Sequence, residues 1–119
     1  MTISKGRIGS REDLPGGTEH TMSAYIVVQI AIHDPATYEH YKELAPASIA
    51  AYGGRYVVRG GPSEVLEGSW QPARLVVLEF PTAAQARAWW GSPEYAPAKA
   101  VRQRCARTEM LLIEGSAAV

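Results

Sequence analysis

The sequence predicts a single α+β domain with a four-stranded antiparallel sheet, in the order β-α-β-β-α-β. Three observations predict it. Segments rich in β-branched residues alternate with segments whose apolar residues recur every three or four positions. The chain has 119 residues, a length typical of one domain with its own hydrophobic core. Apolar residues make up 46% of it, which is ordinary for a globular protein and argues against disorder.

The expected strands are rich in β-branched and apolar residues and are bounded by turn residues. They lie at residues 24–32, 55–59, 74–80 and 109–114. Residues 64–70, which connect the second and third strands, are expected to extend the hairpin that these two strands form.

Helices are expected over about residues 35–52, 83–90 and 94–105. Asp34 is a typical N-cap for the first helix, and Thr82 with Gln85 forms a capping box for the second. Pro46 lies inside the first helix and is expected to kink or break it, because its ring removes a backbone donor. The resulting order is a split βαβ, or ferredoxin-like, pattern with the helices on one face of the sheet.

Both faces of the expected sheet are apolar. In the first strand Ile26, Val28, Ile30 and Ile32 alternate with Tyr25, Val27, Gln29 and Ala31. In the third strand Val76, Leu78 and Phe80 alternate with Leu75, Val77 and Glu79. Helices can cover only one of these faces, and the other would be an oversized apolar patch. We therefore expect a homodimer in which a second copy covers it.

Charge and composition exclude several classes of partner. Twelve basic residues balance twelve acidic ones, so neither nucleic acid nor an anionic membrane surface is expected as a partner. No run of about 18 apolar residues occurs, so no membrane-spanning helix is expected. A single cysteine, Cys105, cannot form an internal disulfide and favours a reducing compartment. We expect a cytoplasmic location, since no signal-peptide pattern opens the chain.

Residues 1–21 are polar, rich in glycine and without periodicity. Such a segment buries too little apolar surface to offset the entropy of ordering it, so we expect a flexible arm before a domain at 22–119. An arm that docks on a partner subunit is the alternative.

Known motifs for metals, cofactors and RNA are missing. The third strand lacks the aromatic motif of RNA-recognition domains, and no Cys-x-x-Cys pair, Walker loop or dinucleotide fingerprint occurs. The sequence contains no asparagine, which acyl-phosphate hydrolases with this pattern use. We therefore expect no metal site and no bound cofactor.

Several segments occur in an order that resembles a known family. They are AYIVVQI, DPATYEHY, AAYGGRYVVRGGPSEVLEG, the motif W-x-P-x-R at residues 70–74, VVLEFPT and AWWGSPEYAPAKAVR. Together they cover about residues 22–115 and resemble the domain of unknown function 1330 family. The resemblance implies a dimeric α+β barrel, in which two ferredoxin-like sheets face each other. It implies no substrate, because the family has no established activity.

Two residues are candidates for acid–base catalysis. Glu79 lies between Leu78 and Phe80 in a strand that looks buried, so its carboxylate must be paired or have a raised pKa. Either state would suit a general base or a ligand anchor, and an ion pair with an arginine, Arg59 or Arg74, is the alternative. His33 could act as an acid–base group near neutral pH, although a histidine in a loop is commonly just solvated.

Seven residues are candidates for ligand binding: Arg59, Gly60, Gly61, Tyr41, Trp89, Tyr95 and Arg102. Arg59 and the two glycines after it could hold a carboxylate or phosphate, or could form a plain hairpin turn. Tyr95 and Arg102 share one stripe of a helix and could point into one cavity, although Tyr95 could instead be a core aromatic. Trp89 and its neighbour Trp90 project about 100° apart, so we expect one in the core and the other in a groove or partner contact.

These candidates favour a small-molecule site between the sheet and the helices, for an anionic or aromatic ligand. Proteins similar in architecture include cofactor-free monooxygenases and isomerases that act on small aromatic or lactone compounds. The alternative is a non-catalytic dimeric module for ligand binding or interaction. Its expected sign is a cavity lined only by apolar residues, with Glu79 and Arg59 paired to each other.

Overall fold

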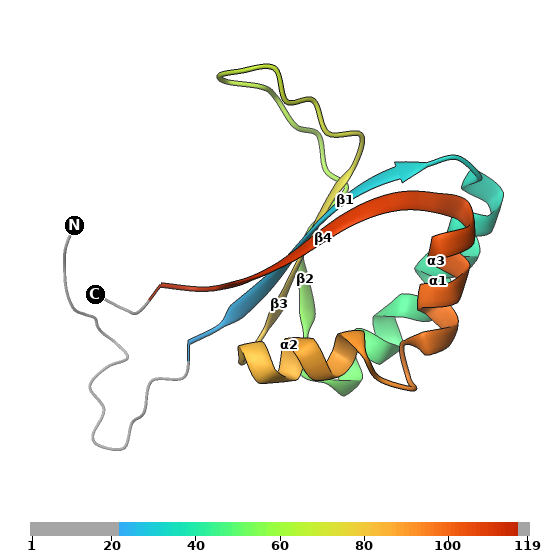
Figure 1. Ribbon diagram of the computed structural model, residues 1–119, viewed down its shortest axis with the longest axis vertical. Coiled ribbons are helices and arrows are strands. Elements are labelled where there is room, and N and C mark those ends of the chain that lie inside the picture. Colours follow the sequence, from blue (N-terminus) through green and yellow to red (C-terminus); the bar gives the residue numbers. More distant parts are fainter. Residues whose placement is uncertain (1–21, 117–119) are drawn as a thin grey trace.

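The computed structural model describes residues 22–116 and confirms the predicted α+β fold. Its elements are β1 (Ala24–Ile32), α1 (Pro35–Ala51), β2 (Arg55–Arg59), β3 (Leu75–Phe80), α2 (Ala83–Trp90), α3 (Ala96–Cys105) and β4 (Ala106–Glu114). The strands form one antiparallel sheet in the order β2-β3-β1-β4, and the three helices lie on one side of it (Figure 1). The predicted arm at 1–21 lies outside the described residues.

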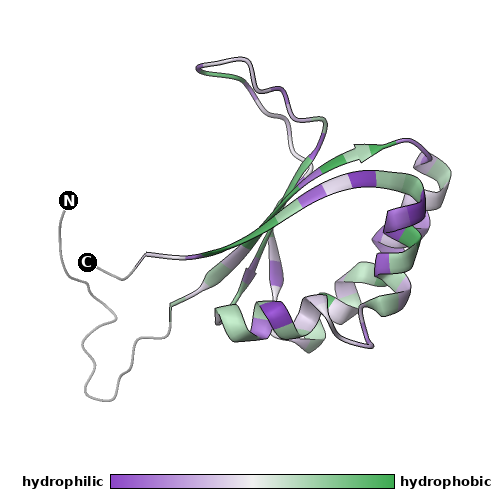
Figure 2. Ribbon diagram, viewed as in Figure 1, coloured by the Kyte–Doolittle hydropathy of each residue, from purple (hydrophilic) through white to green (hydrophobic). Residues whose placement is uncertain are grey.

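The central strand β1 pairs with β3 on one side and with β4 on the other. Hydrophobic residues run along its length (Figure 2), as two alternating sets. The set that faces the helices is buried, whereas its neighbours are half-buried. This alternation is the pattern expected when the helices cover one face only.

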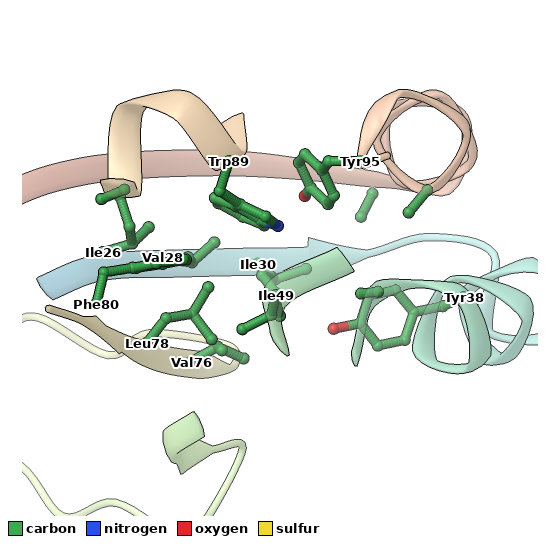
Figure 3. Close-up of a cluster of buried hydrophobic side chains, with 14 of the residues drawn as sticks. Ile26, Val28, Ile30, Tyr38, Ile49, Val76, Leu78, Phe80, Trp89 and Tyr95 are labelled. Atoms are coloured by element: carbon green, nitrogen blue, oxygen red, sulfur yellow. The ribbon is translucent and has the colours of Figure 1, made fainter. Parts of the chain in front are cut away.

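The core lies between the sheet and the helices (Figure 3). Trp89 is its largest fully buried side chain, and its ring lies 4.1 Å from that of Tyr95 and 5.5 Å from that of Phe80, measured between centroids. Trp90 is 47% exposed, which agrees with the prediction that only one of the two tryptophans enters the core.

The predicted N-caps are confirmed. Asp34 accepts hydrogen bonds from the backbone N–H and the hydroxyl of Thr37, and these bonds lower the pKa of its carboxyl. Thr82 Oγ1 accepts from the backbone N–H of Gln85 at 3.0 Å, so the capping box opens α2.

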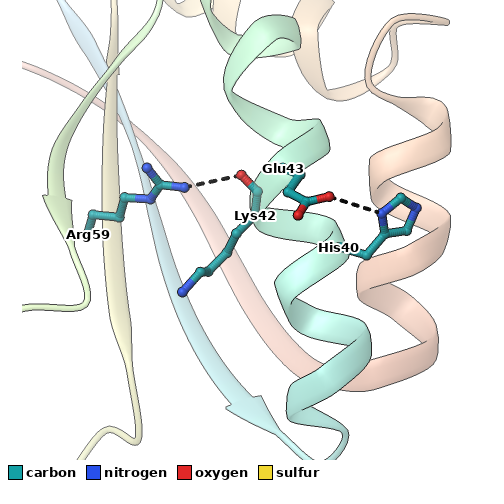
Figure 4. A network of polar contacts seen from close by, with 4 residues as sticks. All are labelled: His40, Lys42, Glu43 and Arg59. Atoms are coloured by element: carbon teal, nitrogen blue, oxygen red, sulfur yellow. Dashed lines mark hydrogen bonds and ion pairs between the residues drawn. The ribbon is translucent and has the colours of Figure 1, made fainter.

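Pro46 does not break α1, which runs through it as one helix, and the alternative that it kinks the helix stays a prediction. A proline cannot donate to the carbonyl four residues earlier, which here belongs to Lys42. The Arg59 guanidinium donates to that carbonyl instead, at 3.3 Å (Figure 4). The bond lost from the helix is therefore replaced by one from β2.

Two other elements differ from the prediction: the connection between β2 and β3, and the start of β4. Residues 64–70 form no strand but part of a long exposed connection that extends away from the helices (Figure 1). The fourth strand begins at Ala106, three residues before the expected start, because the register with β1 continues to Ile32. The first residues of this strand are polar, so their own composition does not indicate a strand.

The face of the sheet turned away from the helices, called the open face here, is apolar as predicted. A row of aliphatic side chains crosses all four strands: Val58, Val77, Val27 and Leu111. Leu111 is 57% exposed and Ile113, in the next row, is 51% exposed. No helix within residues 22–116 is long and apolar enough to cross a membrane.

Candidate functional site

A small cavity lies between the sheet, α1 and β2, and has a volume of about 20 Å³. This is room for about one water molecule. Its floor is formed by aliphatic side chains of β1 and β3, and its walls carry Tyr38, Tyr41 and Tyr56. The charged side chains that line it are Lys42, Arg59 and Arg74, so we call it the cationic cavity.

Arg59 lies at the mouth of this cavity. Its guanidinium stacks over the Tyr56 ring, 4.3 Å from the ring centroid, while it donates to the Lys42 carbonyl. The Lys42 ammonium pairs with Glu39 at 3.1 Å on the surface of α1. Among the described residues, Arg59 itself has no carboxylate partner.

Arg74 lies deeper, beside β3. Its Nε is buried and has no hydrogen-bond partner within residues 22–116. Its guanidinium lies over the Tyr38 ring at 5.6 Å from the centroid. A Cβ at Gly60 would collide with this guanidinium, and Gly60 has a φ of 72°, which L side chains rarely adopt. Gly60 therefore makes room for Arg74.

A chain of polar groups leads from the cavity into α3. The hydroxyls of Tyr41 and Tyr95 lie 2.9 Å apart, and Arg102 Nε donates to the Tyr95 hydroxyl at 3.2 Å. Arg102 also donates to Thr108, and its side chain is only 3% exposed. Either hydroxyl can be the donor in the bond between Tyr41 and Tyr95.

The phenol of Tyr41 is protonated, so it can donate a hydrogen bond but cannot act as a general base. Burial, followed by the neighbouring Tyr95 hydroxyl, raises the pKa of Tyr41 far above its usual value. The phenol therefore stays protonated wherever the protein is folded. With two guanidiniums nearby, the cavity presents only positive charge and hydrogen-bond donors from its polar groups, which suits an anion.

A family model described as "Domain of unknown function (DUF1330)" matches residues 23–116. The chain belongs to this family. The match covers almost all of the described part of the chain and confirms the resemblance found in the sequence. No curated protein matches the chain.

Solved structures share the fold of this DUF1330 domain at low sequence identity. A protein of unknown function from Rhodopseudomonas palustris is 15% identical with a TM-score of 0.66, over 84% of this chain and 87% of that one. SnoaB, a cofactor-independent oxygenase from Streptomyces nogalater, is 16% identical with a TM-score of 0.56, over 80% and 94%. A conserved protein of unknown function from Bacteroides thetaiotaomicron, described as a possible oxidoreductase, is 16% identical with a TM-score of 0.54, over 81% and 100%. These similarities show the fold alone.

The DUF1330 domain brings five of the predicted ligand-binding residues together. Arg59, Tyr41 and Trp89 line the cavity, and Tyr95 with Arg102 stands behind Tyr41. Trp89 also donates from Nε1 to the buried Ser48 hydroxyl at 3.1 Å, which fixes its ring. Gly60 touches Arg74, whereas Gly61 is exposed and has open space around it. No group of three metal-ligating side chains occurs in the described part of the chain.

The two predicted catalytic residues lie outside the cavity. Glu79 is on the open face, where Arg55 Nη2 pairs with it at 2.7 Å and the Tyr25 hydroxyl donates to it at 3.4 Å. Hydrogen bonding from Ser23, then from Arg55, lowers the pKa of Glu79 below its ordinary value of 4.5. The expected pairing with Arg59 or Arg74 is wrong. His33 is exposed in the turn between β1 and α1.

Of the three charged residues that line the cavity, the sequence analysis selected Arg59 as a ligand-binding candidate and missed Lys42 and Arg74. A signal for Arg74 exists, because side chains two positions apart in a strand share a face. Val76, Leu78 and Phe80 form the helix-facing set, and the same alternation continued backwards places Arg74 with them.

Proposed function

We propose that this chain binds a small organic anion, with the anionic group in the cationic cavity. The observation that carries the proposal is the lining: every charged side chain there is a cation, and Nε of Arg74 is buried without a hydrogen-bond partner in the described part of the chain. Leaving such a donor unsatisfied costs about 1–3 kcal/mol. A carboxylate or phenolate oxygen would satisfy it with a charge-assisted bond.

The chemistry that this arrangement supports is stabilisation of negative charge that develops on a bound molecule. Two guanidiniums lower the pKa of a phenol or of a carbon acid beside a carbonyl, so the substrate loses its proton to solvent more readily. Such an anion is the starting point for a cofactor-free oxygenase, where it reduces dioxygen, and for an isomerase, where it is protonated elsewhere. We propose this reaction class from the cavity, since the likeness to SnoaB concerns the fold alone.

A non-catalytic ligand-binding module is the second candidate. One observation favours it: no carboxylate and no histidine lines the cationic cavity, so the protein itself offers no general base there. The sign expected for such a module counts against it: the cavity is not lined only by apolar residues, and Glu79 pairs with Arg55 while Arg59 bonds a backbone carbonyl. Both candidates therefore share the anion site and differ only in turnover.

We also propose that two copies pack through their open faces. Aliphatic side chains form a continuous row there, exposed on the edge strands and half-buried on the central strands, and a second identical face would remove them from water. Leu111→Glu should place a charge in this row and convert the dimer to a monomer, as measured by light scattering on a sizing column. A wild-type monomer at micromolar concentration would refute the assembly.

Thermal denaturation of the full chain with salicylate tests the anion site. Salicylate should raise the melting temperature in proportion to the logarithm of its concentration, whereas salicyl alcohol, which is neutral, should not. Arg59→Ala should abolish most of this effect, and Arg104→Ala, an exposed arginine on α3, should leave it unchanged. An equal response to both compounds would refute the proposal. Oxygen uptake with dihydroxynaphthalene then separates an oxygenase from a binding module.

A further inference from the structure

The cationic cavity can hold only the charged end of a ligand. Its volume is about 20 Å³, whereas pockets for whole small molecules measure about 300–1,000 Å³. The body of a bound anion must therefore extend out of it. The surroundings of the cavity show where that body can lie.

An open groove of about 410 Å³ lies on the same side of the sheet, between α2 and the edge strand β4. Its lining is Ile26, Ala86, Arg87, Trp90, Met110 and Leu112, and we call it the apolar groove. Trp90 forms one wall, and its ring is held by Lys99, whose ammonium lies 3.7 Å from the ring centroid and donates to the Trp90 carbonyl. The size and the apolar lining suit the body of a small molecule.

Met110 lines both the cationic cavity and the apolar groove. It lies opposite Val28 in the pairing of β4 with β1, next to the row in which Leu112 lies opposite Ile26. This half-buried side chain is the one residue that the linings of the cavity and the groove share. Methionine is unbranched and has three rotatable bonds, so it can move aside at low cost.

We propose that the cationic cavity and the apolar groove form one binding site for an amphipathic carboxylate, divided in the empty protein by Met110. The carboxylate binds between Arg59 and Arg74, and the apolar chain passes Met110 to lie against Trp90 and Leu112. This inference rests on the proposed anion site and adds the class of ligand. The change from cationic to apolar lining along the site matches a molecule with one charged and one apolar end.

Isothermal titration of the full chain with propionate, octanoate and octanol tests the inference. Octanoate has five more methylenes than propionate, and each buried methylene improves affinity about fourfold. Octanoate should therefore bind at least about a hundredfold more tightly than propionate. Octanol should bind more weakly than octanoate, because it lacks the charge for the two arginines. In protein carrying ¹³C-methyl methionine, the Met110 methyl signal, assigned from Met110→Leu, should shift with octanoate.

Two variants separate this inference from the anion site itself. Met110→Trp should close the passage, so that octanoate binds no more tightly than propionate while propionate binding persists. Trp90→Ala is the second variant. Because Trp90 is exposed, this variant should fold and tests the inference even if Met110→Trp does not. It should weaken octanoate about tenfold and leave propionate unchanged.

The results that would overturn this inference differ from those that would overturn the anion site. Propionate and octanoate of equal affinity would overturn the inference and leave the anion site standing, whereas no binding of either would overturn both. Octanol as tight as octanoate would show that the groove is independent of the arginines. If a second copy covers the groove, octanoate will lower the mass of the assembly in light scattering, and this result too would overturn the inference.

Discussion

Replacing Arg74 by methionine should stabilise the empty protein and at the same time remove its anion binding. Under the proposed anion site the two effects have one cause, because Nε of Arg74 has no hydrogen-bond partner within residues 22–116. Methionine has a similar reach and no polar atom that needs a hydrogen bond. This combination is what a residue kept for binding at the expense of stability should show.

The size of the effect follows from the contacts of Arg74. Removing its buried, unsatisfied Nε relieves about 1–3 kcal/mol. The contact between the guanidinium and the Tyr38 ring is also lost. The two lie 5.6 Å apart, close to the longest distance for a cation–π contact, so its loss costs about 0.5–1 kcal/mol. The net gain is about 1 kcal/mol, or about 4–8 °C in the melting temperature of a domain of this size. The ligand loses one hydrogen bond to a charged group, which costs about 1.5–3 kcal/mol of binding free energy and lowers the affinity by a factor of about 10–150.

Thermal denaturation followed by circular dichroism measures the first effect, and titration with salicylate measures the second. Arg104→Met is the matched control, since Arg104 is exposed on α3 and outside the cavity. It should change neither quantity by more than a few tenths of a kcal/mol. A fall in the melting temperature of Arg74→Met, with salicylate binding intact, would show that Arg74 is structural and would refute the reasoning.

Three further substitutions test other parts of the structure. Pro46→Ala restores the helical bond that Arg59 now replaces, so it should stabilise α1 by up to about 3 kcal/mol and weaken salicylate binding; unchanged binding would argue against that link. Glu79→Gln should lower the melting temperature at neutral pH. The difference from wild type should vanish as the pH falls below 4.5, because the folded-state pKa of Glu79 is lowered and its contribution is lost on protonation; a difference independent of pH would contradict the ion pair. Ser48→Ala leaves the buried Trp89 Nε1 without an acceptor and should cost about 1–3 kcal/mol in urea unfolding, whereas no loss would mean that another acceptor replaces it.

Most of the fold could be predicted because its signals are local. The apolar run of β1 and the N-caps of α1 and α2 follow from the residues themselves, and the structure places them as predicted. The predictions that fail concern features that depend on residues distant in the sequence. At Pro46 the carbonyl that the proline leaves free is bonded by a guanidinium from β2, and the start of β4 follows its pairing with β1.

The candidate site could be predicted in part. Helical spacing places Tyr95 and Arg102 on one stripe, and the structure joins them by a hydrogen bond. Tyr41 lies on α1, so its bond to Tyr95 depends on the packing of α1 against α3. The pairing of Glu79 could not be predicted in this way. A carboxylate in an apolar strand needs a partner, but the sequence does not say which of several arginines lies opposite it.

The sequence by itself determined the order of the elements, the two apolar faces of the sheet and a set of cationic and aromatic residues between sheet and helices. Only the tertiary structure decided which face each arginine of β2 joins. Arg55 lies opposite Glu79 on the open face, and strict alternation along the strand would place Arg59 there too. An irregularity between Tyr56 and Val58 turns Arg59 to the helix side, where it reaches the cationic cavity. An extra residue of this kind depends on the pairing of two strands, so no local pattern reveals it.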